Sequence, residues 1–169
     1  MSASTSLRDY QRTLSARLLN PQSAPSAIWL GIESGGHSWL LDLADVGETL
    51  PRPPLHPVPL TQPWLLGVAN IRGDLHTLID LGLFAGHAAA TITDQSRAVL
   101  VAPRHRMFCG FLVDRVSGLY RADQFLEPVS GNAGQNWLQT IEHAETRKTW
   151  LKPGIPGLLK ATVFLNIAT

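Results

Sequence analysis

The segment from Pro63 to Phe84 reads PWLLGVANIRGDLHTLIDLGLF and contains two apolar runs, Leu65 to Ile71 and Leu75 to Leu83. The runs flank Arg72-Gly73-Asp74. A Gly-Asp pair between extended segments is typical of a mirror-image hairpin turn, because glycine accepts positive φ without a Cβ clash. The segment therefore predicts a β-hairpin with a charged tip.

The residues just before this hairpin predict a short helical turn. Thr61 can cap the start of the turn, and Pro63 can take its first position, where the missing N–H costs nothing. We expect Trp64 to Leu66 to anchor the turn, and Gly67 to release the chain into the strand.

Apolar runs recur in pairs elsewhere in the chain, around short polar turns, which is typical of antiparallel strands. The pairs are Ile28–Glu33 with Ser38–Leu43, Ala98–Ala102 with Phe108–Val113, and Trp137–His143 with Thr146–Leu151, and an extended run at Val116–Tyr120 continues the second pair as in a meander. A proline-rich passage from Pro51 to Pro59 must be extended and cannot be a central strand. Short strands at regular spacing with few helices predict a mainly β fold, built as barrels or a closed sandwich.

The first 26 residues differ from the rest. Apolar residues recur there at helical spacing until Asn20-Pro21, and these are Leu7, Tyr10, Leu14 and Leu18. The pattern predicts an amphipathic helix, which could pack on the domain or act as a partner-binding arm. The composition from Pro21 to Ser26 is that of a linker. We therefore expect a helix and linker over residues 1–26 and one domain over residues 27–169.

Composition limits the kinds of partner. The net charge of +1 argues against nucleic acid and anionic membranes, which need clustered cations, and the basic turn Arg104-His105-Arg106 lacks interleaved aromatics. No apolar run approaches the roughly 20 residues of a membrane helix, so membrane insertion is not expected. Cys109 is the one cysteine, which excludes a disulfide within the chain and fits a reduced, cytoplasmic compartment.

The sequence gives little support for catalysis, a metal or a cofactor. None of the six histidines is four residues from another, and no G-x-S-x-G motif is present. Asp80 and Asp114 each follow an apolar run, which could place two carboxylates at adjacent strand ends, as a glycosidase requires. Aspartates at strand ends more often cap turns. A small β-barrel hydrolase that uses Asp80 and Asp114 is therefore the alternative to a non-enzymatic protein.

Three motifs, in this order along the chain, resemble the signature of CheW-type chemosensory coupling proteins. Val46-Gly47-Glu48 is similar to the V-x-E of the family. Pro63 to Gly73 and Thr77 to Leu81 are similar to W-x-x-G-x-x-N-x-R-G followed by a strand that ends in P-x-x-D-L. Gly110 to Val116 is similar to G-x-x-V-D-x-V. The resemblance covers residues 28 to 150.

Further details resemble the PilI-type branch of this family, which serves type IV pili. One is the leader helix from Leu7 to Leu19, and another is Val68-Ala69 before the N-x-R-G motif. The third is Thr77, where flagellar relatives usually have proline.

The resemblance implies two five-stranded β-barrel-like subdomains around a shared apolar core, and no enzymatic activity. It implies an adaptor that couples the cytoplasmic tip of a methyl-accepting chemoreceptor to the regulatory domain of a chemotaxis-type histidine kinase. The output would be type IV pilus twitching motility. A scaffold for another chemosensory output is the alternative within the same fold.

The resemblance also implies a partner-binding site. Its residues would lie beside, line or border a receptor-contacting groove between the subdomains, and they are Arg72, Asn70, Ile71, Gly73, Val46 and Glu48. An arginine at a hairpin tip suits such an interface, because its planar fork can pair while its stem packs. Alternatively, Arg72 could be structural and pair with an internal carboxylate such as Asp80 or Asp114.

Overall fold

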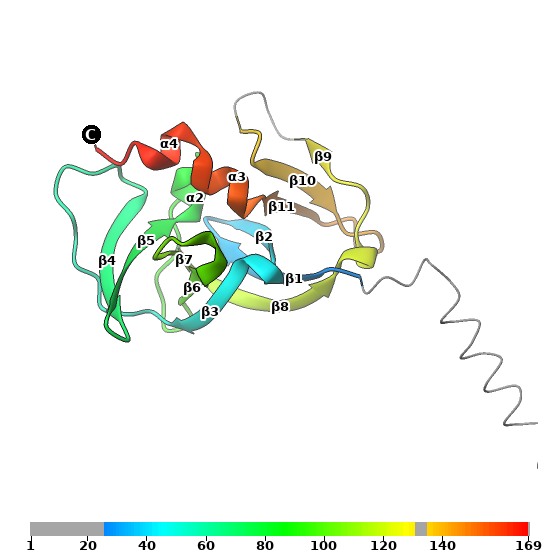
Figure 1. Cartoon of the computed structure of the whole chain (residues 1–169). Coiled ribbons are helices and arrows are strands. Elements are labelled where there is room, and N and C mark those ends of the chain that lie inside the picture. The colour runs from blue at the N-terminus through cyan, green and yellow to red at the C-terminus, as the bar shows by residue number, and fades with distance from the viewer. Residues whose placement is uncertain (1–25, 131–134, 169) are drawn as a thin grey trace, which may run out of the picture.

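A computed structural model describes residues 26–130 and 135–168 of the chain (Figure 1). The strands are β1 (Ile28–Ser34), β2 (His37–Asp42), β3 (Val46–Pro51), β4 (Leu65–Ile71), β5 (Asp74–Asp80), β6 (Arg97–Val101), β7 (Cys109–Val113), β8 (Arg115–Arg121), β9 (Val129–Ser130), β10 (Leu138–Glu142) and β11 (Thr149–Pro153). The helices are α2 (Leu81–Phe84), α3 (Ile155–Lys160) and α4 (Thr162–Leu165), with 3-10 turns η1 (Leu43–Asp45), η2 (Pro103–His105) and η3 (Ala122–Gln124). The amphipathic helix predicted at Leu7–Leu19 lies outside the described residues.

The strands form two sheets. One has the order β3-β6-β7-β5-β4, and the other has the order β8-β1-β2-β11-β10-β9. Since β9 is only two residues long, each sheet has five main strands. The middle of the chain builds the first sheet, and its two flanks build the second. The prediction of a mainly β fold with two five-stranded subdomains is confirmed.

The inner strands of each sheet have buried side chains on both faces, and successive residues alternate between different clusters. On β2, Trp39 and Leu41 enter a cluster shared between the sheets, while Leu40 enters a second cluster with Trp29 and Trp150. On β6, Val99 and Val101 face the shared cluster, while Ala98 and Leu100 join a third cluster with Ala69, Ile71 and Leu78. This alternation follows the two-residue period of a strand. The molecule thus has a shared core and a smaller core on the far side of each sheet.

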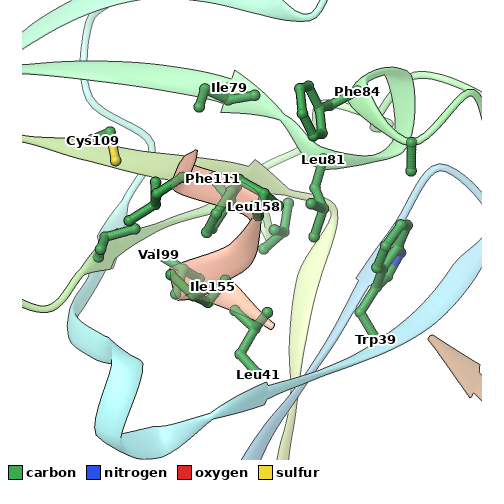
Figure 2. Packing of buried hydrophobic residues seen from close by; sticks show 14 of the residues in the cluster. Trp39, Leu41, Ile79, Leu81, Phe84, Val99, Cys109, Phe111, Ile155 and Leu158 are labelled. Carbon is green, nitrogen blue, oxygen red and sulfur yellow. The ribbon is translucent and has the colours of Figure 1, made fainter. Parts of the chain in front are cut away.

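Helix α3 contributes three buried side chains to the shared core, those of Ile155, Leu158 and Leu159. Figure 2 shows Ile155 and Leu158 of α3 in one cluster with Leu41 of β2 and with Val99 and Phe111 of the five-stranded sheet. Both α3 residues are almost completely buried. Cys109 packs in the same core, and its burial raises the pKa of the thiol to about 11.

The central hairpin forms as predicted, with two differences. Its turn consists of Arg72 (φ 55°) and Gly73 (φ 97°), so Asp74 is already the first residue of β5. The second strand stops at Asp80, because the Asp80 carboxylate accepts a 3.0 Å hydrogen bond from the Leu83 N–H and caps α2. The predicted strand over Leu81–Leu83 is therefore wrong.

The helical turn predicted from Thr61 is also wrong. A hydrogen bond of 3.0 Å from the Leu65 N–H to the Gln62 carbonyl closes a turn, and Thr61 pairs with Ala168 as an isolated bridge. β4 begins at Leu65, and Gly67 (φ 138°) lies at a bulge inside it. The backbone pairing of Thr61 with the C-terminal segment is a long-range contact, which local capping rules do not anticipate.

The predicted meander ends after β7. The antiparallel pair of β6 and β7 forms, but β7 also pairs in parallel with β5, and β8 crosses to the other sheet and pairs with β1. The Asp114 N–H donates to the Glu33 carbonyl at 2.9 Å, which directs the chain toward β1. The proline-rich passage follows β3, an edge strand, as expected. No helix among the described residues is long and apolar enough to cross a membrane.

Candidate partner-binding site

A groove of about 540 Å³ opens on the five-stranded sheet, between β3, the tip of the β4–β5 hairpin and the turn from β6 to β7. Its walls combine apolar and charged side chains, and the lining residues are Gly47, Glu48, Ile71, Arg72, Asp74, His76, Leu100, Val101, Pro103, Arg106, Met107 and Phe108. The structure thus brings together Arg72, Ile71 and Glu48, three of the six predicted site residues.

Arg72 and Glu48 form an ion pair across this groove. Arg72 Nη2 lies 2.6 Å from Glu48 Oε1, and the two side chains are 77% and 36% exposed. β3 and β4 are the opposite edges of the five-stranded sheet, so the pair spans the gap between them. Exposed ion pairs contribute only about 0–1 kcal/mol to folding. Arg72 pairs with neither Asp80 nor Asp114, so the expected alternative of an internal carboxylate partner is wrong.

The turn holds Arg72 in a strained backbone conformation. Its φ of 55° lies in the left-handed region, which costs a residue with a Cβ about 1–2 kcal/mol. The Asn70 carboxamide oxygen accepts a 2.9 Å hydrogen bond from the Gly73 N–H and braces the turn. Ile71 points inward and is 8% exposed, within the third core. Asn70, Ile71 and Gly73 therefore position the arginine, which projects into solvent.

Val46 lies apart from the other predicted site residues. A shift in the pairing of β3 with β6 falls between Val46 and Glu48, at Gly47. Two strand residues in alternate positions normally share a face, but an extra residue in the strand breaks this relation. Val46 accordingly packs against the shared core, whereas Glu48 lines the groove.

Sequence reasoning missed the aromatic wall of the groove. Phe108 is 61% exposed, and its ring meets the His76 ring edge to face at a centroid distance of 5.3 Å. The side chains of Phe108 and Met107 also line a second, apolar pocket of about 270 Å³ beside α4. A partly exposed phenylalanine between two hollows is a typical interface anchor. The signal in the sequence was weak, because Phe108 reads as the start of an apolar strand.

The turn from β6 to β7 is held in place by a buried carboxylate. Asp45 of η1 binds the Arg104 guanidinium, and its Oδ1 lies 2.7 Å from His105 Nε2. The Asp45 side chain is only 9% exposed. Two of the three basic residues of this turn are therefore used within the fold, while Arg106 (φ 54°) lines the groove.

The two aspartates of the hydrolase alternative both bind backbone groups of one loop. Asp80 accepts from the Leu83 N–H at 3.0 Å and the Ala90 N–H at 2.8 Å. Asp114 accepts from the Thr91 N–H at 2.6 Å, and burial raises the pKa of this carboxyl. Both aspartates therefore cap turns, as aspartates at strand ends commonly do. Among residues 26–130 and 135–168, no group of three or more His, Cys, Asp or Glu side chains could hold a metal ion.

Comparison with known proteins identifies the family. A family model described as "CheW-like domain" matches residues 29–150, which is most of the chain. The chain belongs to the CheW-like domain family. It is 33% identical over 163 residues to Protein PilI of Pseudomonas aeruginosa, across 93% of this chain and 89% of that protein. Its fold is similar to that of the scaffolding protein TtCheW from Thermoanaerobacter tengcongensis, with a TM-score of 0.62, 18% identity and coverage of 76% of this chain and 88% of that one.

Membership of the CheW-like family decides between the two classes of function. CheW-like proteins are non-enzymatic scaffolds and adaptors of chemosensory signalling, and this chain is one of them. The hydrolase alternative is therefore wrong, in agreement with the capping roles of Asp80 and Asp114.

Proposed function

We propose that this CheW-like protein couples the cytoplasmic tip of a methyl-accepting chemoreceptor to the regulatory domain of a chemotaxis-type histidine kinase. The system would control type IV pilus twitching motility, and the protein would work in the cytoplasm. The pilus assignment is supported by the 33% identity to Protein PilI over almost the whole chain. The adaptor assignment is supported by the CheW-like family and by a groove suited to a protein partner.

The observation that carries this proposal is the position of Arg72. The side chain is exposed above an apolar groove, and the exposed Glu48 is its ion-pair partner. A carboxylate or carbonyl of a partner can replace Glu48 at little cost, because an exposed pair contributes little to folding. Partner side chains can then bury the apolar wall around Phe108.

The six predicted residues divide into three roles in this proposal. Arg72 and Glu48 are the contact residues. Asn70, Ile71 and Gly73 hold the turn that presents Arg72. Val46 does not line the groove, and it anchors the start of β3 to the shared core, next to the bulge at Gly47.

Binding of the full chain to the receptor tip and to the kinase regulatory domain tests the proposal. Both proteins come from the same organism, and affinities are measured separately. We expect each to bind, and Arg72→Ala to weaken binding of at least one about tenfold, which corresponds to the loss of about 1.4 kcal/mol.

Arg147→Ala is the matched control. Arg147 has the same left-handed backbone (φ 58°), is 68% exposed, and pairs with Glu142 at 2.6 Å, but it does not line the groove. This variant should bind both partners as the native chain does. A folded protein that captures neither partner would contradict the adaptor proposal. If deletion of the gene alters another motility or sensory output and leaves twitching intact, the alternative chemosensory scaffold is correct.

A further inference from the structure

Two stretches from different sheets meet closely at one point, away from the groove. One is the β1–β2 turn, at Gly35, and the other is the loop that follows α2, at Ala88. An added Cβ at Gly35 (φ 58°) or at Gly82 would collide with the Ala88 carbonyl oxygen. Only glycine allows the backbones to approach this closely. We call this contact of Gly35 and Gly82 with Ala88 the inter-sheet joint.

The loop side of the joint is fixed by the two aspartates described above. The Ala90 N–H donates to Asp80 at 2.8 Å, and the Thr91 N–H donates to Asp114 at 2.6 Å. Both carboxylates come from the ends of neighbouring strands in the five-stranded sheet. The loop is therefore anchored to that sheet by backbone hydrogen bonds.

Two histidines close the joint. The rings of His37, at the start of β2, and His87, in the loop, lie with their centroids 4.1 Å apart at an angle of 31°. The His87 ring also meets Trp39 edge to face at 5.8 Å. Trp39 is completely buried in the shared core, and its Nε1 donates to the Ser34 carbonyl at 2.9 Å. The histidine stack therefore connects the turn, the loop and the shared core.

We propose that the stack of His37 and His87 is a proton-sensitive contact between the two sheets, closed when both rings are neutral and opened when both are protonated. Two imidazolium ions at this separation repel each other, and the half-buried position of His87 weakens the screening of its charge by water. Histidine is the side chain whose ordinary pKa lies nearest to neutral pH. The contact would therefore respond to mild acidification.

The direction of the response follows from His87. Burial, and then the charge of His37, lower the pKa of His87 from its ordinary value. The unfolded chain therefore takes up the proton more readily than the folded chain does, so the folded contact loses stability as the pH falls below about 6.5.

The charged groups on the neighbouring elements do not reverse this direction. Asp80 and Asp114 accept backbone N–H groups of the loop, and Glu33 of β1 pairs with Arg115 at 2.9 Å. Burial raises the pKa of Asp114, which favours the folded chain at lower pH. Asp114 therefore acts in the opposite direction and cannot cause an acid-induced opening.

Hydrogen exchange of the full chain at pH 7.5 and 5.5, corrected for the intrinsic rate, tests this proposal. We expect the backbone of residues 34–37 and 82–91 to exchange up to about tenfold faster at pH 5.5, relative to the β4–β5 hairpin. The limit is about tenfold because pH 5.5 lies about one unit below the ordinary histidine pKa of about 6.5, and one titrating group contributes at most a factor of ten per unit below that value. In the same sample, nitrogen-15 spectra of the imidazoles should give a titration midpoint for His87 below the ordinary histidine value.

His87→Phe keeps an aromatic ring against Trp39 but removes the group that takes up a proton. The difference in corrected exchange rate between pH 7.5 and 5.5 should therefore disappear in this variant. His37→Phe, at the more exposed side of the stack, should act in the same way and serves if His87→Phe does not fold. His56→Gln changes an exposed histidine away from the joint and should leave the pH response intact. The proposal is overturned if the corrected exchange rates of residues 34–37 and 82–91 are the same at pH 7.5 and pH 5.5. It is also overturned if a folded phenylalanine variant shows the same increase in exchange at pH 5.5 as the native chain.

Discussion

Arg72 combines an unfavourable backbone conformation with an exposed side chain. The left-handed φ of 55° has a cost, and the ion pair with Glu48 is too exposed to repay it. Strain of this kind persists where a side chain must be presented in a fixed direction. The hairpin could be predicted from its two apolar runs and the Gly73-Asp74 pair, although the turn lies one residue earlier, at Arg72-Gly73. The pairing with Glu48 could not, because it depends on the approach of two sheet edges that are 24 residues apart in the chain.

Arg72→Gly separates the cost of the backbone from the value of the side chain. Glycine removes the left-handed penalty of about 1–2 kcal/mol, but it adds about 0.5–1 kcal/mol of backbone entropy in the unfolded chain and loses a pair worth up to about 1 kcal/mol. We expect a free energy of unfolding within about 1 kcal/mol of the native value, measured by urea denaturation, together with weakened partner binding. A loss of several kcal/mol would instead show that Arg72 supports the fold.

At the scale of single elements, the strands followed from apolar periodicity, while their ends depended on tertiary contacts. β2 reads as a continuous apolar run because it is buried on both faces. β5 ends at Asp80 because this side chain caps α2 and also holds the loop near Ala90. The groove was only partly predictable for a related reason. Phe108 and Met107 lie in a turn that the buried Asp45 holds in place through His105. Asp45 precedes His105 by 60 residues, so this contact is not visible in the local sequence.

A substitution at Gly67 tests whether the bulge in β4 requires glycine at this position. Its φ is 138°, and an added Cβ would collide with the carbonyl oxygen of His56, which pairs with Val68 across the sheet edge. Gly67→Ala should therefore lower the free energy of unfolding by roughly 2 kcal/mol or more, since both the backbone and the neighbouring strand must move.

Gly36→Ala provides the comparison for Gly67→Ala. Gly36 has a φ of 77° but no atom within 4 Å of an added Cβ. The cost there is limited to the left-handed conformation, about 1–2 kcal/mol. Thermal and urea denaturation of both variants should rank Gly67→Ala as the more destabilised. Equal losses would mean that the contact with His56 is not part of the bulge.

On the scale of the whole molecule, the two sheets depend on one another through the shared core. Each sheet has a smaller apolar cluster on its far side, but the largest cluster draws side chains from both sheets and from α3. Helix α3 follows β11 in the chain and packs among residues of the five-stranded sheet, as Figure 2 shows. An adaptor built in this way can transmit a change from one sheet to the other, because a packed core moves between discrete arrangements.

Leu158→Ala tests this dependence. Leu158 lies in α3 with 0% exposure, and truncation of a buried leucine typically costs about 2–5 kcal/mol. We expect one cooperative unfolding transition at lower urea concentration, with the same midpoint by circular dichroism and by tryptophan fluorescence. Leu165→Ala, in the neighbouring α4 with 63% exposure, should change stability by less than about 1 kcal/mol. Two separate transitions in Leu158→Ala would show that the smaller clusters hold each sheet together independently, and that the shared core does not couple them.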